Sequence, residues 1–151
     1  METEIQHILQ LLENAFEKNA WHGPAIKEVL NDITQEQAIQ RLNSTHSIIE
    51  LVAHITSWRN FVILKLQGYA DFKMTEEMNF PALSDWSLTL KELDKSQEKL
   101  VVELKQFPSA KLSDIVPSSK HHYTFYTLIH GMIHHDVYHA GQIMLIKKTF
   151  Q

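Results

Sequence analysis

Apolar residues recur along most of the chain at the spacing of an amphipathic helix. In the first segment, Ile5, Ile8, Leu12 and Phe16 fall on one stripe at intervals of three and four residues. The same kind of spacing predicts four long helices, over residues 3–19, 47–67, 84–105 and 123–148. No segment shows the alternation of apolar and polar residues that is typical of a half-buried strand. The pattern therefore predicts an all-α protein.

Turn and capping residues separate these helices. The segment Trp21-His22-Gly23-Pro24 interrupts the pattern, because proline disfavours a helical conformation in the residue before it. Ser47 followed by Glu50 fits a capping box at the start of the second long helix, and Gly68 ends that helix. Short helical pieces are expected over 25–32 and 35–41, and loops over 69–83 and 108–119. We expect a four-helix bundle with short extra helical pieces between its first two long helices, in a single domain spanning residues 1–151.

Composition and charge narrow the range of functions. Of the 151 residues, 44% are hydrophobic and 21% charged, and the formal net charge is −4. No basic run exceeds the Lys147-Lys148 pair, which argues against nucleic-acid binding. No apolar stretch is long enough to span a bilayer and no secretory signal is visible, so we expect a cytoplasmic protein without membrane contact. The chain has no cysteine, which excludes disulfides, thiolate metal sites and a cysteine nucleophile.

Histidine is the unusual residue of this composition. Six of the ten histidines lie within residues 121–139, namely His121, His122, His130, His134, His135 and His139. At about 100° per residue, His135 and His139 fall in the middle of the apolar face of the last helix, whereas His130 and His134 fall on another face. Two neutral imidazoles one turn apart are a usual way for a helix to supply two ligands to a metal ion. Two core histidines satisfied by hydrogen bonds are the alternative.

A third ligand must come from upstream, because the twelve residues after His139 include no His, Asp or Glu. The best candidate is His54, which lies close to Trp58 and Phe61 on the inward side of its helix. The predicted metal ligands are therefore His54, His135 and His139. We expect His130 and His134 on the surface or at an interface, and the roles of the remaining candidates stay open: His22, His121 and His122.

Three polar residues near the predicted ligands could fix a histidine tautomer: Glu50, Tyr138 and Gln142. The segment His135-Asp-Val-Tyr-His139 also has the frame of the zincin helix motif, with Asp136 at the position of the glutamate base. However, Asp136 lies away from the histidine face, its side chain is shorter than glutamate, and no third ligand follows. A metallopeptidase is therefore not expected.

These residues resemble a known family. His54 with Trp58, together with His135-x-x-x-His139-x-Gly141-Gln142, is similar to the pattern of the damage-inducible DinB-like (DinB/YfiT-type) family, and the resemblance covers essentially the whole chain. It implies a four-helix bundle in which the three histidines bind a divalent ion, zinc or nickel, that keeps an open position. It also implies a homodimer, and a kinship with thiol-dependent enzymes such as bacillithiol S-transferases and mycothiol-dependent isomerases.

Because the chain has no cysteine, any thiol at such a site must be a small-molecule partner. The leading expectation is a metal-dependent thiol S-transferase that acts on a small-molecule substrate with a low-molecular-weight thiol. A metal-dependent hydrolase, a non-catalytic metal-binding or sensing module, and a metal-free bundle with its histidines at a dimer interface are the alternatives.

Overall fold

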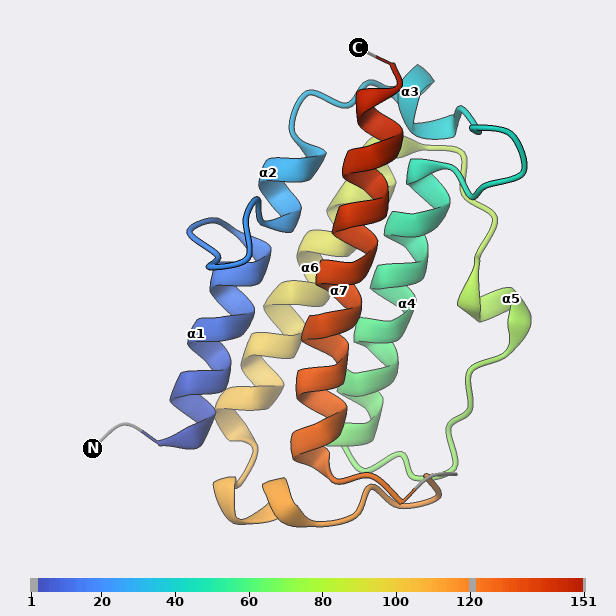
Figure 1. Ribbon diagram of the computed structural model, residues 1–151. Helices are drawn as coiled ribbons and strands as arrows, with labels where there is room; N and C mark the ends of the chain where they lie inside the picture. The colour runs from blue at the N-terminus through green and yellow to red at the C-terminus, as the bar shows by residue number, and fades with distance from the viewer. Residues whose placement is uncertain (1–2, 120–121, 151) are drawn as a thin grey trace.

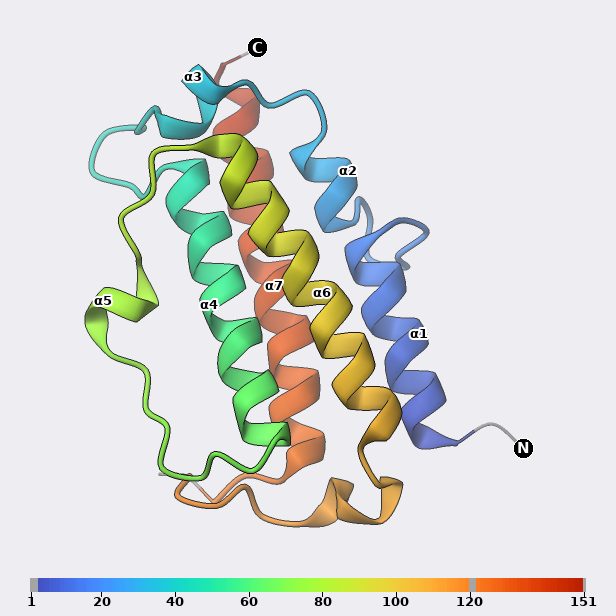
Figure 2. The same cartoon turned by 180° about the vertical axis from the view of Figure 1, so that it is seen from behind.

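Four long helices run side by side in the computed structural model, which describes residues 3–119 and 122–150 (Figures 1 and 2). They are α1 (Glu4–Phe16), α4 (Ile48–Leu66), α6 (Trp86–Gln106) and α7 (Phe125–Lys148). The described residues form no strand, only an isolated bridge between Ile115 and Thr124. The prediction of an all-α four-helix bundle is confirmed. Within the described part of the chain, no helix has both the length and the apolar character needed to cross a membrane.

The helix starts follow the capping residues. Thr3, Thr34 and Thr124 accept hydrogen bonds from backbone N–H groups at the starts of α1, α3 (Gln35–Ile39) and α7, respectively. At the start of α4, the carboxylate of Glu50 accepts from the backbone N–H of Ser47 at 2.8 Å, as the capping box predicted. The two short pieces between the first two long helices are α2 (Ile26–Leu30) and α3, both shorter than expected.

Both predicted loops contain a single helical turn. The segment 69–83 includes α5 (Glu76–Asn79), which begins at Thr75 and lies along the outer side of α4 (Figure 1). The segment 108–119 includes a 3₁₀ turn, η1 (Ser109–Ser113). The prediction of plain loops was wrong at these two places, because a single turn is too short to show a helical period in its apolar residues.

The core consists of two apolar clusters, one toward each end of the bundle. The cluster near α2 and α3 includes Ile26, Ile48, Leu93 and Ile143, and the cluster near the opposite end includes Ile8, Val62, Leu100 and Ile129. Helices α1, α6 and α7 contribute to the core mainly through one face, as the spacing predicted, whereas α4 is buried around most of its circumference.

A buried polar layer lies between the two clusters. Arg59 of α4 is 1% exposed, and donates one hydrogen bond to the Gln97 side chain of α6 at 2.6 Å and another to Asp136 of α7 at 2.7 Å. The Arg59 guanidinium also lies over the ring of Phe16, 4.6 Å from its centre. This network ties three of the long helices together at mid-height, close in sequence to the histidines of α4 and α7.

Candidate metal centre

Helices α4 and α7 bring three histidine side chains together at the middle of the bundle. Nε2 of His54 lies 3.0 Å from Nε2 of His135, and Nε2 of His139 lies 3.1 Å from that same atom. One nitrogen from each of the three rings lies within 4.8 Å of the other two, and no other group of this kind occurs among the described residues. His135 and His139 meet because they are one turn apart on α7. His54 joins them because α4 packs beside α7.

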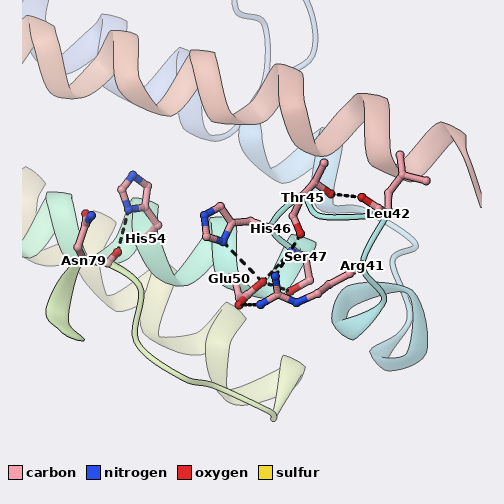
Figure 3. A network of polar contacts seen from close by, with 8 residues as sticks. All are labelled: Arg41, Leu42, Thr45, His46, Ser47, Glu50, His54 and Asn79. Carbon is pink, nitrogen blue, oxygen red and sulfur yellow. Dashed lines mark hydrogen bonds and ion pairs between the residues drawn. The ribbon is translucent and has the colours of Figure 1, made fainter. Parts of the chain in front are cut away.

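Hydrogen bonds to the opposite ring nitrogens orient two of these imidazoles. Nδ1–H of His54 donates to the backbone carbonyl of Asn79 at 2.8 Å, as Figure 3 shows. Nδ1–H of His139 donates to Oε1 of Gln142 at 2.6 Å. Because each proton is on Nδ1, each Nε2 carries a lone pair directed at the third histidine. The buried Nδ1 of His135 has no hydrogen-bond partner among the described residues.

Burial keeps the three rings neutral. Desolvation, together with the neighbouring His139 and His54, lowers the pKa of His135 to about 4. Desolvation also lowers the pKa values of His54 and His139, although the hydrogen bonds that they donate to Asn79 and Gln142, respectively, oppose the shift. Neutral imidazole is the form that ligates a metal ion. The triad is therefore in its ligating state at neutral pH.

The donor set fits a divalent ion. Nitrogens that share one tetrahedral zinc at roughly 2.0–2.1 Å lie about 3.3 Å apart, close to the separations of 3.0 and 3.1 Å within the triad. Without a cation, two lone pairs would compete for at most one ring proton at their centre. Three imidazole ligands also leave a coordination position open in a tetrahedral site, which is the arrangement of catalytic rather than structural zinc.

The segment that follows α5 covers one side of His54. The ring of Phe80 stacks on that of His54 with centres 4.2 Å apart, and His46 stacks on the other face of Phe80 at 4.0 Å. The Asn79 side chain accepts a hydrogen bond from Nε1 of Trp58 at 2.9 Å. Sequence reasoning missed Asn79 and Phe80, because they lie in a segment that we predicted to be a plain loop, where no periodic pattern marks their contacts.

Of the three polar candidates near the triad, only Gln142 contacts a ligand histidine through a hydrogen bond. Its amide nitrogen donates in turn to the hydroxyl of Tyr138 at 3.3 Å, so the Tyr138 hydroxyl is linked to His139 only through Gln142. Tyr138 is exposed, and its ring meets that of His139 edge-on with centres 5.0 Å apart.

Glu50 does not orient His54, which corrects the role that we considered for it. Its carboxylate accepts from the backbone N–H and hydroxyl of Ser47 and pairs with Arg41, as Figure 3 shows. The physical reason is the capping box, which draws the carboxylate back to the start of α4. The contact to His54 comes instead from the backbone of Asn79.

Asp136 is directed away from the triad, as its place on the helix predicted. Its side chain is 1% exposed and its Oδ2 accepts from Arg59 in the polar layer. It is therefore in no position to act as the base of a zincin-like site, although it follows His135 directly in the chain.

The remaining histidines lie outside the triad. His130 is half-buried, donates from Nδ1 to the carbonyl of Tyr126 at 2.9 Å and stacks on that ring. The other described candidates are exposed, namely His22, His122 and His134. His121 lies outside the described residues.

Two cavities adjoin the triad. The first, which we call the Trp58 cavity, has a volume of about 430 Å³ and is lined by His54, Trp58, Asn79, Met132 and His135, among others. The second, which we call the His46 cavity, has a volume of about 620 Å³ and is lined by His46, Phe80, His139, Gln142 and Ile146, among others. Both volumes fall in the range of small-molecule sites, roughly 300–1,000 Å³.

Comparison with known proteins agrees with this geometry. No curated protein and no solved structure shows a significant match to the chain. The sequence profile of the DinB superfamily matches residues 20–143, a stretch that includes all three histidines of the triad and most of the bundle. The chain belongs to the DinB superfamily.

Proposed function

We propose that this protein is a divalent-metal-dependent transferase that joins a low-molecular-weight thiol to an electrophilic small molecule. The observation that carries the proposal is the convergence of three neutral imidazole nitrogens in the wall shared by two cavities. Zinc and nickel are the ions that we expect, since both accept imidazole ligands. The resemblance to thiol-dependent members of the family supports the thiol as co-substrate.

A divalent ion held by the triad would bind a thiol as its thiolate, the form that attacks electrophiles. In the overall reaction, the thiol loses its proton to the solvent and the sulfur forms a bond to an electrophilic carbon. The bond from that carbon to its leaving group breaks, and the leaving group departs with the electron pair. The chain has no cysteine that could compete as a nucleophile.

Side chains and backbone groups of the protein orient the ligand histidines and form the walls of the cavity beside them. Asn79 and Gln142 hold the protons of His54 and His139 on Nδ1, so that their Nε2 atoms remain free to ligate. Trp58 is held by Asn79 as one wall of the cavity beside His54. Tyr123 lines the same cavity, and burial raises the pKa of its phenol further above neutral pH.

Replacement of the triad tests the metal site. We expect His54→Ala, His135→Ala and His139→Ala each to weaken zinc binding by more than about 100-fold, because even the loss of an outer hydrogen-bond partner typically costs about 10–100-fold. Competition with a chromophoric chelator measures the affinity. His130→Ala and His134→Ala are matched controls on α7 and should bind zinc like the unaltered protein. Unchanged zinc affinity in the triad variants would contradict the proposal.

Cobalt substitution tests the thiol. The near-ultraviolet absorption of the cobalt-loaded protein should gain a sulfur-to-metal charge-transfer band on addition of a low-molecular-weight thiol, because an open coordination position can accept a thiolate. A spectrum typical of a coordinatively saturated ion, unchanged by every thiol added, would favour a non-catalytic metal-binding module instead.

A further inference from the structure

The triad lies in a partition between the Trp58 cavity and the His46 cavity. His54 and His135 line the Trp58 cavity, whereas His139 lines the His46 cavity. The end of α5 continues the partition, because its last residue, Asn79, lines the first cavity and the following residue, Phe80, lines the second. An ion held by the three histidines would therefore be reached from two separate sides.

Both cavities are lined mainly by apolar groups, and they differ in the number of side chains that can form hydrogen bonds. Large apolar groups line both, among them Trp58, Leu128 and Met132 in the Trp58 cavity and Leu51, Leu145 and Ile146 in the His46 cavity. Apart from the triad, the side chains of the Trp58 cavity that can form hydrogen bonds to a ligand are Asn79, Tyr123 and Thr127. The His46 cavity presents more groups that can form hydrogen bonds to a ligand, namely Thr45, His46, Tyr138, Gln142 and Thr149. None of the described residues that line either cavity is an Asp, Glu, Lys or Arg. A ligand with several ionised groups would therefore find no side chain of opposite charge in them.

A glycine helps to keep the Trp58 cavity open. Gly131 lies within α7 and lines this cavity, and a Cβ atom placed there would meet no other atom within 4 Å. Glycine inside a helix costs about 1 kcal/mol relative to alanine. A larger side chain at this position would therefore stabilise the helix but would extend into the space that a ligand needs.

We propose that the site binds two small molecules at once, an uncharged apolar or aromatic group in the Trp58 cavity and a more polar thiol in the His46 cavity. The assignment of a thiol to the second cavity rests on the proposed function. The assignment of an apolar group to the first rests on the lining alone. The substrate class that follows is a neutral electrophile with an aromatic or alkyl body, without phosphate or multiple carboxylates.

Methyl NMR of the zinc-loaded protein tests this arrangement with p-cresol and 2-mercaptoethanol as probes. The methyl group of Met132 reports on the Trp58 cavity and the Cδ1 methyl group of Ile146 on the His46 cavity, and Met132→Leu and Ile146→Val assign the two signals. We expect p-cresol to shift the Met132 signal and not that of Ile146. We expect 2-mercaptoethanol to shift the Ile146 signal while p-cresol stays bound, and ethylene glycol, which lacks the sulfur, to shift neither.

Two glycine variants on α7 supply a blocked form and its control. Gly131→Leu should weaken p-cresol binding at least about tenfold, which corresponds to a loss of about 1.4 kcal/mol. Gly141→Leu makes the same chemical change at an exposed position that lines neither cavity and also has open space for a Cβ atom. It should leave p-cresol binding unchanged. Both variants should be at least as stable as the unaltered protein, so loss of folding does not confuse the comparison.

Three outcomes would overturn the inference. They are displacement of p-cresol by 2-mercaptoethanol, equal p-cresol binding in Gly131→Leu and Gly141→Leu, and an Ile146 signal that 2-mercaptoethanol leaves unmoved in zinc-loaded protein. Failure of the proposed function gives a different result. A protein that retains no zinc would still show a shift of the Met132 methyl signal on addition of p-cresol. That result would support the assignment of the apolar group to the Trp58 cavity and contradict the assignment of the thiol to the His46 cavity.

Discussion

At the scale of single residues, the candidate site depends on which ring nitrogen of each histidine carries the proton. A lone pair faces the centre only where Nδ1–H has an acceptor, and Asn79 and Gln142 supply acceptors for His54 and His139. One acceptor is a backbone carbonyl, which no substitution removes directly. The other is the side-chain amide of Gln142, which can be replaced.

Gln142→Leu should lower zinc affinity by about 10–100-fold, the usual cost of losing an outer partner of a metal-bound histidine. The variant removes the acceptor for Nδ1–H of His139 and keeps a side chain of similar size. Chelator competition measures the affinity. Tyr138→Phe is the control, since its hydroxyl contacts Gln142 and not a ligand, and it should change the affinity much less. Equal affinities in all three proteins would show that Gln142 does not support the site.

At the scale of single elements, the capping interactions at the start of α4 fix where this helix begins. Glu50 lies one turn before His54 and closes the capping box with Ser47, and it also pairs with Arg41. Partial burial raises the pKa of Glu50, but the hydrogen bonds from Ser47 and the charge of Arg41 outweigh this effect. The net result is a pKa below its ordinary value.

A depressed carboxyl pKa makes this contribution to stability pH-dependent. The contribution is complete above the unfolded-state pKa, about 4.3 for glutamate, and is lost as the pH falls through the folded-state value. Glu50→Gln should therefore lower the free energy of unfolding by about 0.5–1 kcal/mol at pH 7, through loss of the helix-dipole and ion-pair interactions. Urea denaturation at several pH values should show this difference shrinking below about pH 4.

A comparison with Glu50→Ala separates the contribution of the Glu50 charge to stability from that of its capping hydrogen bond. Alanine cannot accept the hydrogen bond from the backbone of Ser47, so this variant should remain destabilised by about 1 kcal/mol even in acid, where Glu50→Gln approaches the unaltered protein. A difference between Glu50→Gln and the unaltered protein that stays constant from pH 7 to pH 3 would contradict the linkage.

At the scale of the whole molecule, the polar layer holds three helices together between two apolar clusters. Arg59 and Asp136 are both 1% exposed, so neither charge has access to solvent. Such a pair adds little net stability over a well-packed apolar replacement, yet removal of one partner leaves the other charge buried and uncompensated. The layer joins α4, α6 and α7 at positions close to the triad, and we expect it to favour one relative placement of these helices.

Asp136→Leu should therefore lower the free energy of unfolding by about 3–5 kcal/mol, because it strands the guanidinium of Arg59. The double variant Arg59→Met with Asp136→Leu removes both charges and should recover most of that loss. Denaturant unfolding of the metal-free proteins gives the comparison. A double variant whose loss of stability equals the sum of the losses in Asp136→Leu and Arg59→Met would show that the two charges are not coupled, and would contradict this account.

The periodic part of the structure could be predicted from the sequence, and the aperiodic part could not. Apolar spacing located all four long helices, and the helical wheel separated His135 and His139 from His130 and His134, because both follow from the constant 100° step of a helix. Asn79 and Phe80 had no such signal. They belong to a segment whose position depends on how it packs against α4. Glu50 is close to His54 on the helical wheel, but its carboxylate contacts Ser47 at the start of its own helix.

By itself, the sequence determined the helical fold, the absence of any internal thiol and the choice of three inward histidines. These depend on local spacing and on residue chemistry. Only the tertiary structure decided that the Nε2 atoms of His54 and His139 each lie about 3 Å from that of His135, that Asn79 and Gln142 orient two of the rings, and that the triad divides two cavities. The physical reason is that these properties arise between helices, where packing sets distances to a fraction of an ångström and no repeat along the chain records them.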